Sequence, residues 1–152
     1  MSVRFRYLPH RVHAPVIPLG GRSHRPRPVI GVTVLGPSTS WVLDALLDTG
    51  ADDTVFPDHV AALIGVDLAN APAGTSAGVG SGSGSVRYAR VALRIADNQE
   101  RREWQAWVGF TSAPLRHPLL GFAGFLQYFT AAFRGGVAPG PALPERGRRP
   151  GG

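Results

Sequence analysis

The chain of 152 residues contains no cysteine and no lysine. Without a thiol it can form neither a disulfide nor a cysteine nucleophile. Without lysine it lacks the residue that a Walker-type P-loop places on phosphate. No apolar run approaches the roughly 20 residues of a membrane-spanning helix, and residues 1–28 have no apolar stretch long enough for a signal peptide. These absences favour a soluble protein that does not enter a membrane, and we expect it in the cytoplasm.

Positive charge is concentrated at the two ends of the chain, and all sixteen basic side chains are arginines. Residues 1–28 have six arginines and no acid, residues 29–133 have six arginines and nine acids, and residues 134–152 have four arginines and one acid. This distribution predicts a basic extended arm (1–28), one folded domain (29–133) and a disordered tail rich in Pro, Gly and Arg (134–152). The basic ends leave contact with nucleic acid open as an alternative role.

Apolar residues alternate with polar residues along most of the central segment, which predicts strands. In two of these strands one face is apolar: Ala89, Val91, Leu93 and Ile95 in the first, and Trp104, Ala106, Val108 and Phe110 in the second. A helix is indicated only at residues 57–65, which end in glycine, and after residue 121, where Phe122, Phe125, Phe129 and Phe133 recur at helical spacing. The sequence therefore predicts a mainly β fold. The expected strands are 3–7, 29–35, 41–47, 85–96, 101–110 and a very short one within 117–121.

The segment "LLDTGADDTVF" places Asp48 directly after an apolar strand. An aspartate before glycine is often a simple turn residue, and a single short motif can match by chance. Two later features favour a functional role. Residues 74–84, "GTSAGVGSGSG", contain five glycines, and the apolar triplet Leu119-Leu120-Gly121 precedes the expected terminal helix.

These segments, in this order, resemble the retropepsin-like (retroviral-type) aspartic proteases over residues 29–133. "LLDTGADDTV" is similar to their active-site segment, "AGVGSGSGSV" to their flap, and "LLGFAGFLQYF" to the segment beneath the active site. The resemblance implies a half-barrel with a flap hairpin and one C-terminal helix, working as a homodimer. Each chain would then contribute one Asp48, because the motif occurs only once.

The implied activity is that of an aspartic endopeptidase. Two carboxylates about 3 Å apart share one proton. The ionised one draws a proton from a water molecule while the protonated one hydrogen-bonds the scissile carbonyl. Because water is the nucleophile, the resemblance implies neither a metal nor an organic cofactor. The implied partners are a second copy of the chain and a peptide or protein substrate.

The resemblance also assigns roles to single residues. Thr49 would hydrogen-bond across the dimer axis, and Gly50 would leave room for the water. Ala51 replaces the hydroxyl found in pepsin-like enzymes, so we expect activity nearer mildly acidic to neutral pH. The catalytic set is Asp48, Thr49 and Gly50; the substrate-binding set is Ala51, Asp52, Asp53, Val79, Gly80, Ser81, Gly82 and Leu119; structural support comes from Leu120 and Gly121.

The sequence departs from the retroviral pattern in two places. Phe122 stands where retroviral enzymes have an arginine that pairs with the residue matching Asp52. The C-terminal tail is rich in proline, which removes hydrogen-bond donors from a strand, so residues 3–7 are the better candidate for a strand at the dimer interface.

Other functions remain open. The chain could be a non-catalytic retropepsin-like module that binds peptides or dimerises. A serine hydrolase is disfavoured because the glycines and serines of residues 80–84 alternate in the wrong register for G-x-S-x-G. A zinc site at His10 and His13 lacks further ligands, and nucleic acid is disfavoured as the main partner.

Overall fold

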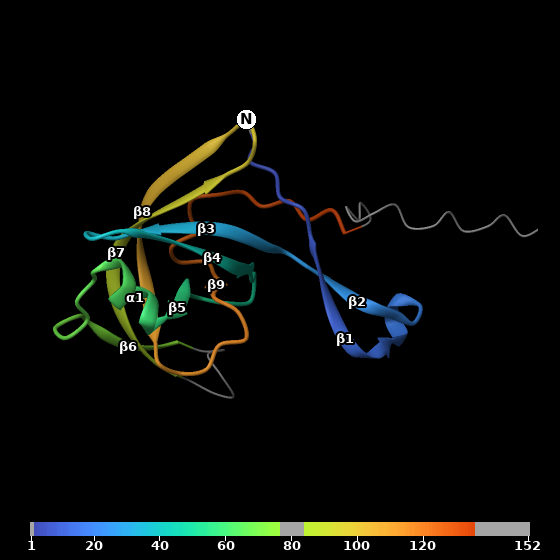
Figure 1. The fold of residues 1–152 in the computed structure, drawn as a ribbon, viewed down its shortest axis with the longest axis horizontal. Helices are drawn as coiled ribbons and strands as arrows, with labels where there is room; N and C mark the ends of the chain where they lie inside the picture. The colour runs from blue at the N-terminus through green and yellow to red at the C-terminus, as the bar shows by residue number, and fades with distance from the viewer. Residues whose placement is uncertain (1, 77–83, 136–152) are drawn as a thin grey trace, which may run out of the picture.

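The computed structural model describes residues 2–76 and 84–135. Within them the fold is mainly β, and it consists of a closed barrel and a separate two-stranded hairpin (Figure 1). Six strands form the barrel in the order β3-β4-β9-β5-β8-β7, and pairing between β3 and β7 closes it. A further strand, β6, extends the sheet beyond β7.

The strands predicted from alternation form the wall of the barrel. β3 (Val29–Leu35) and β4 (Ser40–Leu47) are antiparallel, and β7 (Gly84–Ala96) pairs with β8 (Arg101–Thr111) along a long hairpin. Their inward side chains make the core, which confirms the predicted apolar faces of β7 and β8. Fully buried core side chains from these strands include Val32, Val34, Leu93, Val108 and Phe110.

Two short strands complete the barrel next to the end of β4. β9 (Leu119–Leu120) lies between β4, to which it is parallel, and β5 (Val55–Pro57), to which it is antiparallel. The predicted short helix is present as α1 (Asp58–Ile64), and Gly65 ends it in the left-handed conformation at φ 85°.

The strands on either side of the glycine-rich segment pair with each other. β6 (Ala73–Ser76) pairs with the start of β7, from Ala73 opposite Arg87 to Ser76 opposite Gly84. The predicted flap residues Val79, Gly80, Ser81 and Gly82 lie outside the described residues.

The prediction of a C-terminal helix is wrong. Residues 122–128 form successive turns, in which the amides of Leu126 and Gln127 donate to the carbonyls of Gly121 (3.1 Å) and Phe122 (2.9 Å), five residues back. Gly124 adopts φ 91°, which an α-helix does not accommodate, and its amide donates to Gln127 Oε1 at 2.7 Å. Helical spacing of the phenylalanines instead reflects their packing: Phe125 and Phe129 both lie against Trp104.

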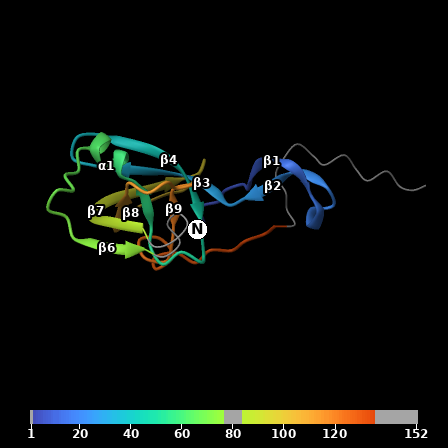
Figure 2. The same ribbon diagram turned by 90° about the horizontal axis from the view of Figure 1, so that it is seen from below.

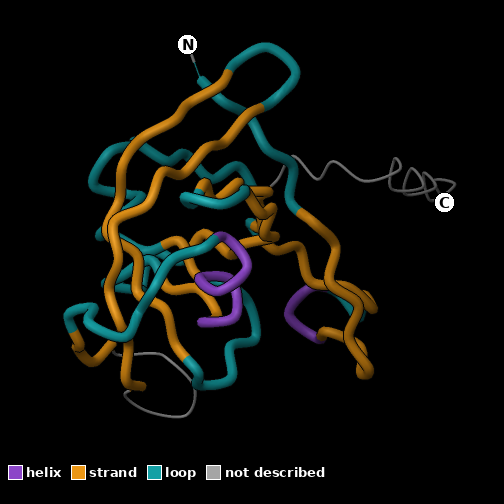
Figure 3. Tube along the Cα trace, turned by 60° about the vertical axis from the view of Figure 1, so that its left-hand side comes forward, coloured by secondary structure: helices purple, strands orange, loops and turns teal. Residues whose placement is uncertain are grey.

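The N-terminal segment also differs from the expectation. Residues 3–7 form no strand in the single chain, whereas the Arg- and Pro-rich residues after them do. β1 (Leu8–Val16), the 3-10 turn η1 (Ile17–Leu19) and β2 (Arg22–Arg27) make a hairpin that projects from the barrel (Figures 2 and 3). We call residues 8–27 the arm.

No helix in residues 2–76 and 84–135 is both long enough and apolar enough to cross a membrane. The predicted disorder of the tail falls almost entirely on residues 136–152, which lie outside the described part of the chain.

Candidate functional site

Asp48 lies at the end of β4, where the barrel wall turns into a loop. Its amide donates to the carbonyl of Leu120 in β9 at 3.0 Å, so the neighbouring strand fixes the backbone. Asp48 as a whole is half-buried, and its carboxylate accepts a hydrogen bond from the amide of Gly50 at 2.9 Å. The apolar strand thus delivers an acidic side chain to the barrel end in a defined orientation.

The triplet Leu119-Leu120-Gly121 and the residues after it lie against this loop. After Gly121 the chain hydrogen-bonds to the loop residues: the Phe122 amide donates to the Ala51 carbonyl (2.9 Å) and the Ala123 amide to the Asp52 carbonyl (2.8 Å). A Cβ on Gly121 would lie 2.7 Å from the Ala51 carbonyl oxygen, so only glycine fits.

Thr54 is a supporting residue that the sequence interpretation missed. It is fully buried, and its hydroxyl accepts a hydrogen bond from the Gly121 amide at 3.3 Å. Its own amide donates to the Ala123 carbonyl, and its carbonyl accepts from the Gly109 amide. Its position just after the acidic pair gave no local sign of this role, because both Gly121 and Gly109 are more than 50 residues away in sequence.

The predicted site residues differ in exposure. Thr49, Gly50 and Asp52 are exposed, Leu119 is half-buried, and Ala51 and Leu120 are buried. The carboxylate of Asp52 has no hydrogen bond or ion pair with any described residue. Phe122, at the position where the resemblance expects an arginine, presents a side chain that is 61% exposed.

Asp53 has a specific partner that was not predicted. The hydroxyl of Tyr88, in β7, donates to Asp53 Oδ2 at 2.8 Å. Burial, the hydrogen bond to Asp53 and the charge of Asp53 together raise the pKa of Tyr88 to about 12. The hydroxyl therefore remains a donor throughout the neutral range, and it connects β7 to the loop that carries Asp48.

Two glycines make room for the Tyr88 ring. A Cβ on Gly74 in β6 would lie 2.6 Å from the ring, and one on Gly109 in β8 would lie 3.4 Å from it. Tyr88 lies on the opposite face of β7 from Val91, in a small cluster with Val55 and Val86. The alternation of β7 was assigned to one face only, so this second apolar face was overlooked.

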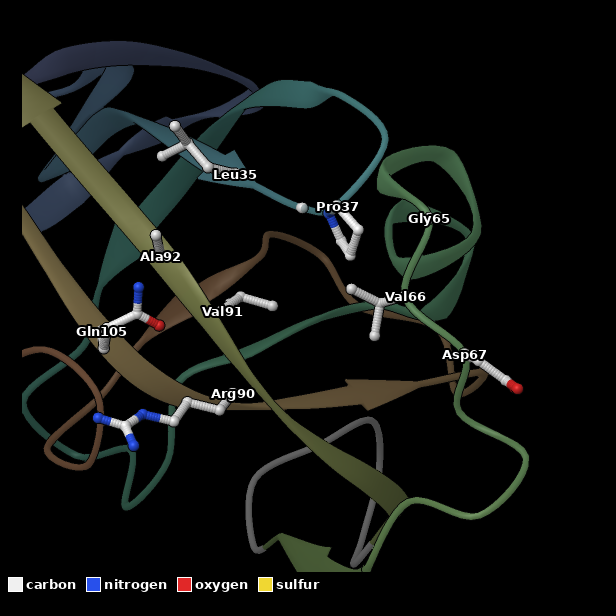
Figure 4. Close-up of a pocket in the computed structure, with 10 residues that line it drawn as sticks. Leu35, Pro37, Gly65, Val66, Asp67, Arg90, Val91, Ala92 and Gln105 are labelled. Carbon is white, nitrogen blue, oxygen red and sulfur yellow. The ribbon is translucent and has the colours of Figure 1, made fainter.

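Two hollows among the described residues lie away from Asp48. One, of about 380 Å³, is lined by Leu35, Pro37, Val66, Arg90 and Gln105, among others, at the far end of β3 (Figure 4). The other lies within the arm. Neither contains a predicted site residue.

The described residues contain no group of three or more His, Asp and Glu side chains that could hold a metal ion. His10 lies beside His117, with ring centroids 5.8 Å apart, rather than forming a site with His13.

A scan against protein-family models and a search of curated proteins found no match. The functional argument therefore depends on the residues and on their geometry.

Proposed function

We propose that this chain is an aspartic endopeptidase of the retropepsin-like type, active as a homodimer. The observation that carries the proposal is the position of Asp48. This half-buried residue stands at a barrel end, in a loop fixed by β9 and by the close approach of Gly121. Such rigid support for one acidic group is what catalytic geometry requires.

Peptide hydrolysis by this site needs a second carboxylate. The chain offers the motif only once, and Thr49 and Gly50 beside Asp48 are exposed, so the loop is free to meet the same loop of another copy. In the pair, one ionised Asp48 takes a proton from a water molecule, and the water oxygen attacks the carbonyl carbon of the peptide. The other, protonated Asp48 gives its proton to the carbonyl oxygen, and a tetrahedral diol forms. When the diol collapses, the C–N bond breaks, the first Asp48 passes its proton to the leaving amine, and a hydroxyl of the diol returns a proton to the second Asp48.

The neighbouring residues support binding of an extended peptide. Asp52 and Asp53 follow the catalytic loop, and the hairpin β6–β7 contributes Tyr88 to the same region. An extended substrate would form strand-like hydrogen bonds both to this loop and to the glycine-rich segment. Leu119 supplies a partly exposed apolar contact beneath it.

The test is cleavage of a mixed peptide library by the purified protein and by the variant Asp48→Asn. Asp44→Asn is the matched control, because Asp44 lies on the same strand, is exposed and has no hydrogen bond or ion pair with a described residue. We expect Asp48→Asn to lose at least about 1000-fold in kcat/KM, as removal of a catalytic group does, and Asp44→Asn to cleave like the wild type.

Sedimentation of both variants would show whether the dimer is preserved. Equal cleavage by Asp48→Asn and the wild type would refute the assignment. A dimeric wild type that binds peptides from the library without cleaving any would favour the alternative, a non-catalytic binding module.

A further inference from the structure

We propose that the arm, residues 8–27, is a docking element that lies against the barrel of a second copy of this chain. The inference depends on the proposed function, in which two copies bring their Asp48 loops together. It identifies the partner surface that holds those copies in place.

The arm leaves the barrel at the end that carries Asp48. Its root is fixed there because the Leu47 amide donates to the Pro28 carbonyl at 2.8 Å, and Val29 pairs with Leu46. Both views show the arm extending away from its own barrel (Figures 1 and 2). Any copy that meets this chain at Asp48 therefore comes close to the arm.

The arm lacks a covering layer in its own chain. β1 and β2 form a sheet of only two strands, and such a hairpin is at best marginally stable in water without packing. Its apolar side chains are largely uncovered: Ile17 at the tip is 86% exposed and Leu8 is 44% exposed. A surface that covers these side chains would stabilise the hairpin.

The charges indicate what kind of surface this is. The arm contains four arginines and no acid, whereas residues 29–133 have six arginines against nine acids. Arg22 and Arg25 form no ion pair with a described residue, and the exposed carboxylate of Asp52 on the barrel forms none either. Because the arm points away from its own barrel, these opposite charges can meet only between two copies.

Arg27 at the arm's base adds an independent observation. Its Nε atom is buried and has no hydrogen-bond partner among the described residues. His10 and His117 lie against each other nearby, and the pKa of His117 is lowered by burial and then by the charges of His10, Arg27 and Arg116. Among the described residues, neither Arg27 nor Arg116 at this junction forms an ion pair with a carboxylate, so the base of the arm carries uncompensated positive charge.

The phosphates of a nucleic acid would pair with the arginines of the arm but would not cover its apolar tip. A second copy offers both acidic and apolar surface, including Phe122 beside the catalytic loop, and it is brought to the arm by the same contact that pairs the Asp48 loops. A second copy is therefore the better occupant.

The first experiment uses the absence of cysteine. Ile17→Cys, labelled with a photoreactive cross-linker, is mixed with ¹⁵N-labelled wild-type protein, and the cross-linked peptides are identified by mass spectrometry. We expect cross-links from position 17 to residues 29–133 of the labelled copy. Leu63→Cys is the control, because Leu63 is also exposed but lies on α1, next to the β3–β4 turn at the far end of β4 from Asp48.

The second experiment measures dimer dissociation by sedimentation at low salt. We expect the pair Arg22→Gln and Arg25→Gln to raise the dissociation constant about tenfold or more, through loss of charge pairing. The matched pair Arg90→Gln and Arg134→Gln removes the same charge from exposed positions outside the arm, and we expect a change of less than about twofold.

The results separate this inference from the proposed function. The inference is overturned, and the proposed function is kept, by the following result. The wild type dimerises and cleaves peptides, the arm substitutions leave its dissociation constant unchanged, and position 17 cross-links only within one copy. Intercopy cross-links in a protein that cleaves no peptide support the inference and refute the function. Loss of salt-sensitive retention on DNA in the arm variant, with an unchanged dimer, would assign the arm to nucleic acid and overturn the inference.

Discussion

The contact between Tyr88 and Asp53 joins two segments that are 35 residues apart in sequence. Tyr88 lies in β7, beside the strand that leads to the glycine-rich segment, and Asp53 lies in the loop after Asp48. A hydrogen bond to a charged group is stronger than one between neutral groups. This single bond therefore helps to set the position of the hairpin relative to the proposed catalytic loop.

We predict that Tyr88→Phe both destabilises the folded protein and weakens its binding of substrate. The ring still fills the space left by Gly74 and Gly109, but the hydroxyl is lost, so we expect a cost of about 1–2 kcal/mol in the free energy of unfolding. In peptide cleavage KM should rise more than kcat falls, because Tyr88 positions Asp53 and does not touch the reacting atoms.

Urea unfolding and steady-state kinetics measure these two effects. Tyr128→Phe is the matched control, since Tyr128 is 50% exposed and its hydroxyl has no hydrogen bond with a described residue. A Tyr88→Phe variant that is as stable as the control would contradict the prediction.

The same residue predicts how stability changes at alkaline pH. The pKa of Tyr88 is raised from 10.0 to about 12 in the folded state, so the unfolded chain loses this proton first. Its contribution to stability is therefore complete below pH 10 and is lost between about pH 10 and 12. Between pH 10 and 12, the free energy of unfolding should fall more steeply with pH for the wild type than for Tyr88→Phe.

At the scale of elements, alternation located the strands well because each barrel strand buries one face. β3 has the predicted bounds, and the predicted inward residues of β7 and β8 line the core. The phenylalanines from Phe122 to Phe133 misled the helix prediction. Phe125 and Phe129 pack against Trp104 from successive turns, whereas Phe122 and Phe133 are exposed. The arm was missed as a hairpin because its strands pair without an apolar core to create alternation.

The candidate site was predictable only in part. Asp48 and Gly121 could be identified because their sequence segments are distinctive, and the structure places them at adjoining strand ends. Tyr88 and Thr54 could not, because their roles depend on which distant strands become neighbours. Pairings between strands far apart in sequence are not encoded in any local pattern.

We predict that Gly121→Ala destabilises the element beneath the site. The added methyl group would overlap the Ala51 and Asp53 carbonyl oxygens, both in a hydrogen-bonded loop that cannot move freely. Overpacking of this kind costs about 1–3 kcal/mol, and cleavage should fall as well. Thermal unfolding and peptide cleavage measure both effects.

Gly31→Ala provides the control, because it adds the same methyl group in β3 with nothing within 4 Å. We expect a change of less than about 0.5 kcal/mol for that variant. Equal stability of the two variants would show that β9 does not hold the loop as tightly as the geometry indicates.

On the scale of the whole molecule, the chain divides into a net acidic barrel and a basic arm, and both are incomplete alone. The barrel presents a single Asp48, and the arm presents two strands without a covering layer. A two-fold arrangement would complete both at once, because each copy supplies what the other lacks. Catalysis and association should therefore depend on protein concentration in the same way.

This dependence predicts that Asp48→Asn inhibits the wild type when the two are mixed. The variant keeps the arm and the barrel, so it should pair with wild-type chains, but a mixed dimer has only one catalytic carboxylate. With free exchange at concentrations where dimers predominate, an equal amount of variant should reduce the activity of a fixed amount of wild type to about one half, and a ninefold excess to about one tenth. Peptide cleavage after equilibration measures this ratio, and Asp44→Asn should leave the activity per chain unchanged. If activity stayed constant in the presence of excess Asp48→Asn, each chain would have to work alone, and the shared site would be excluded.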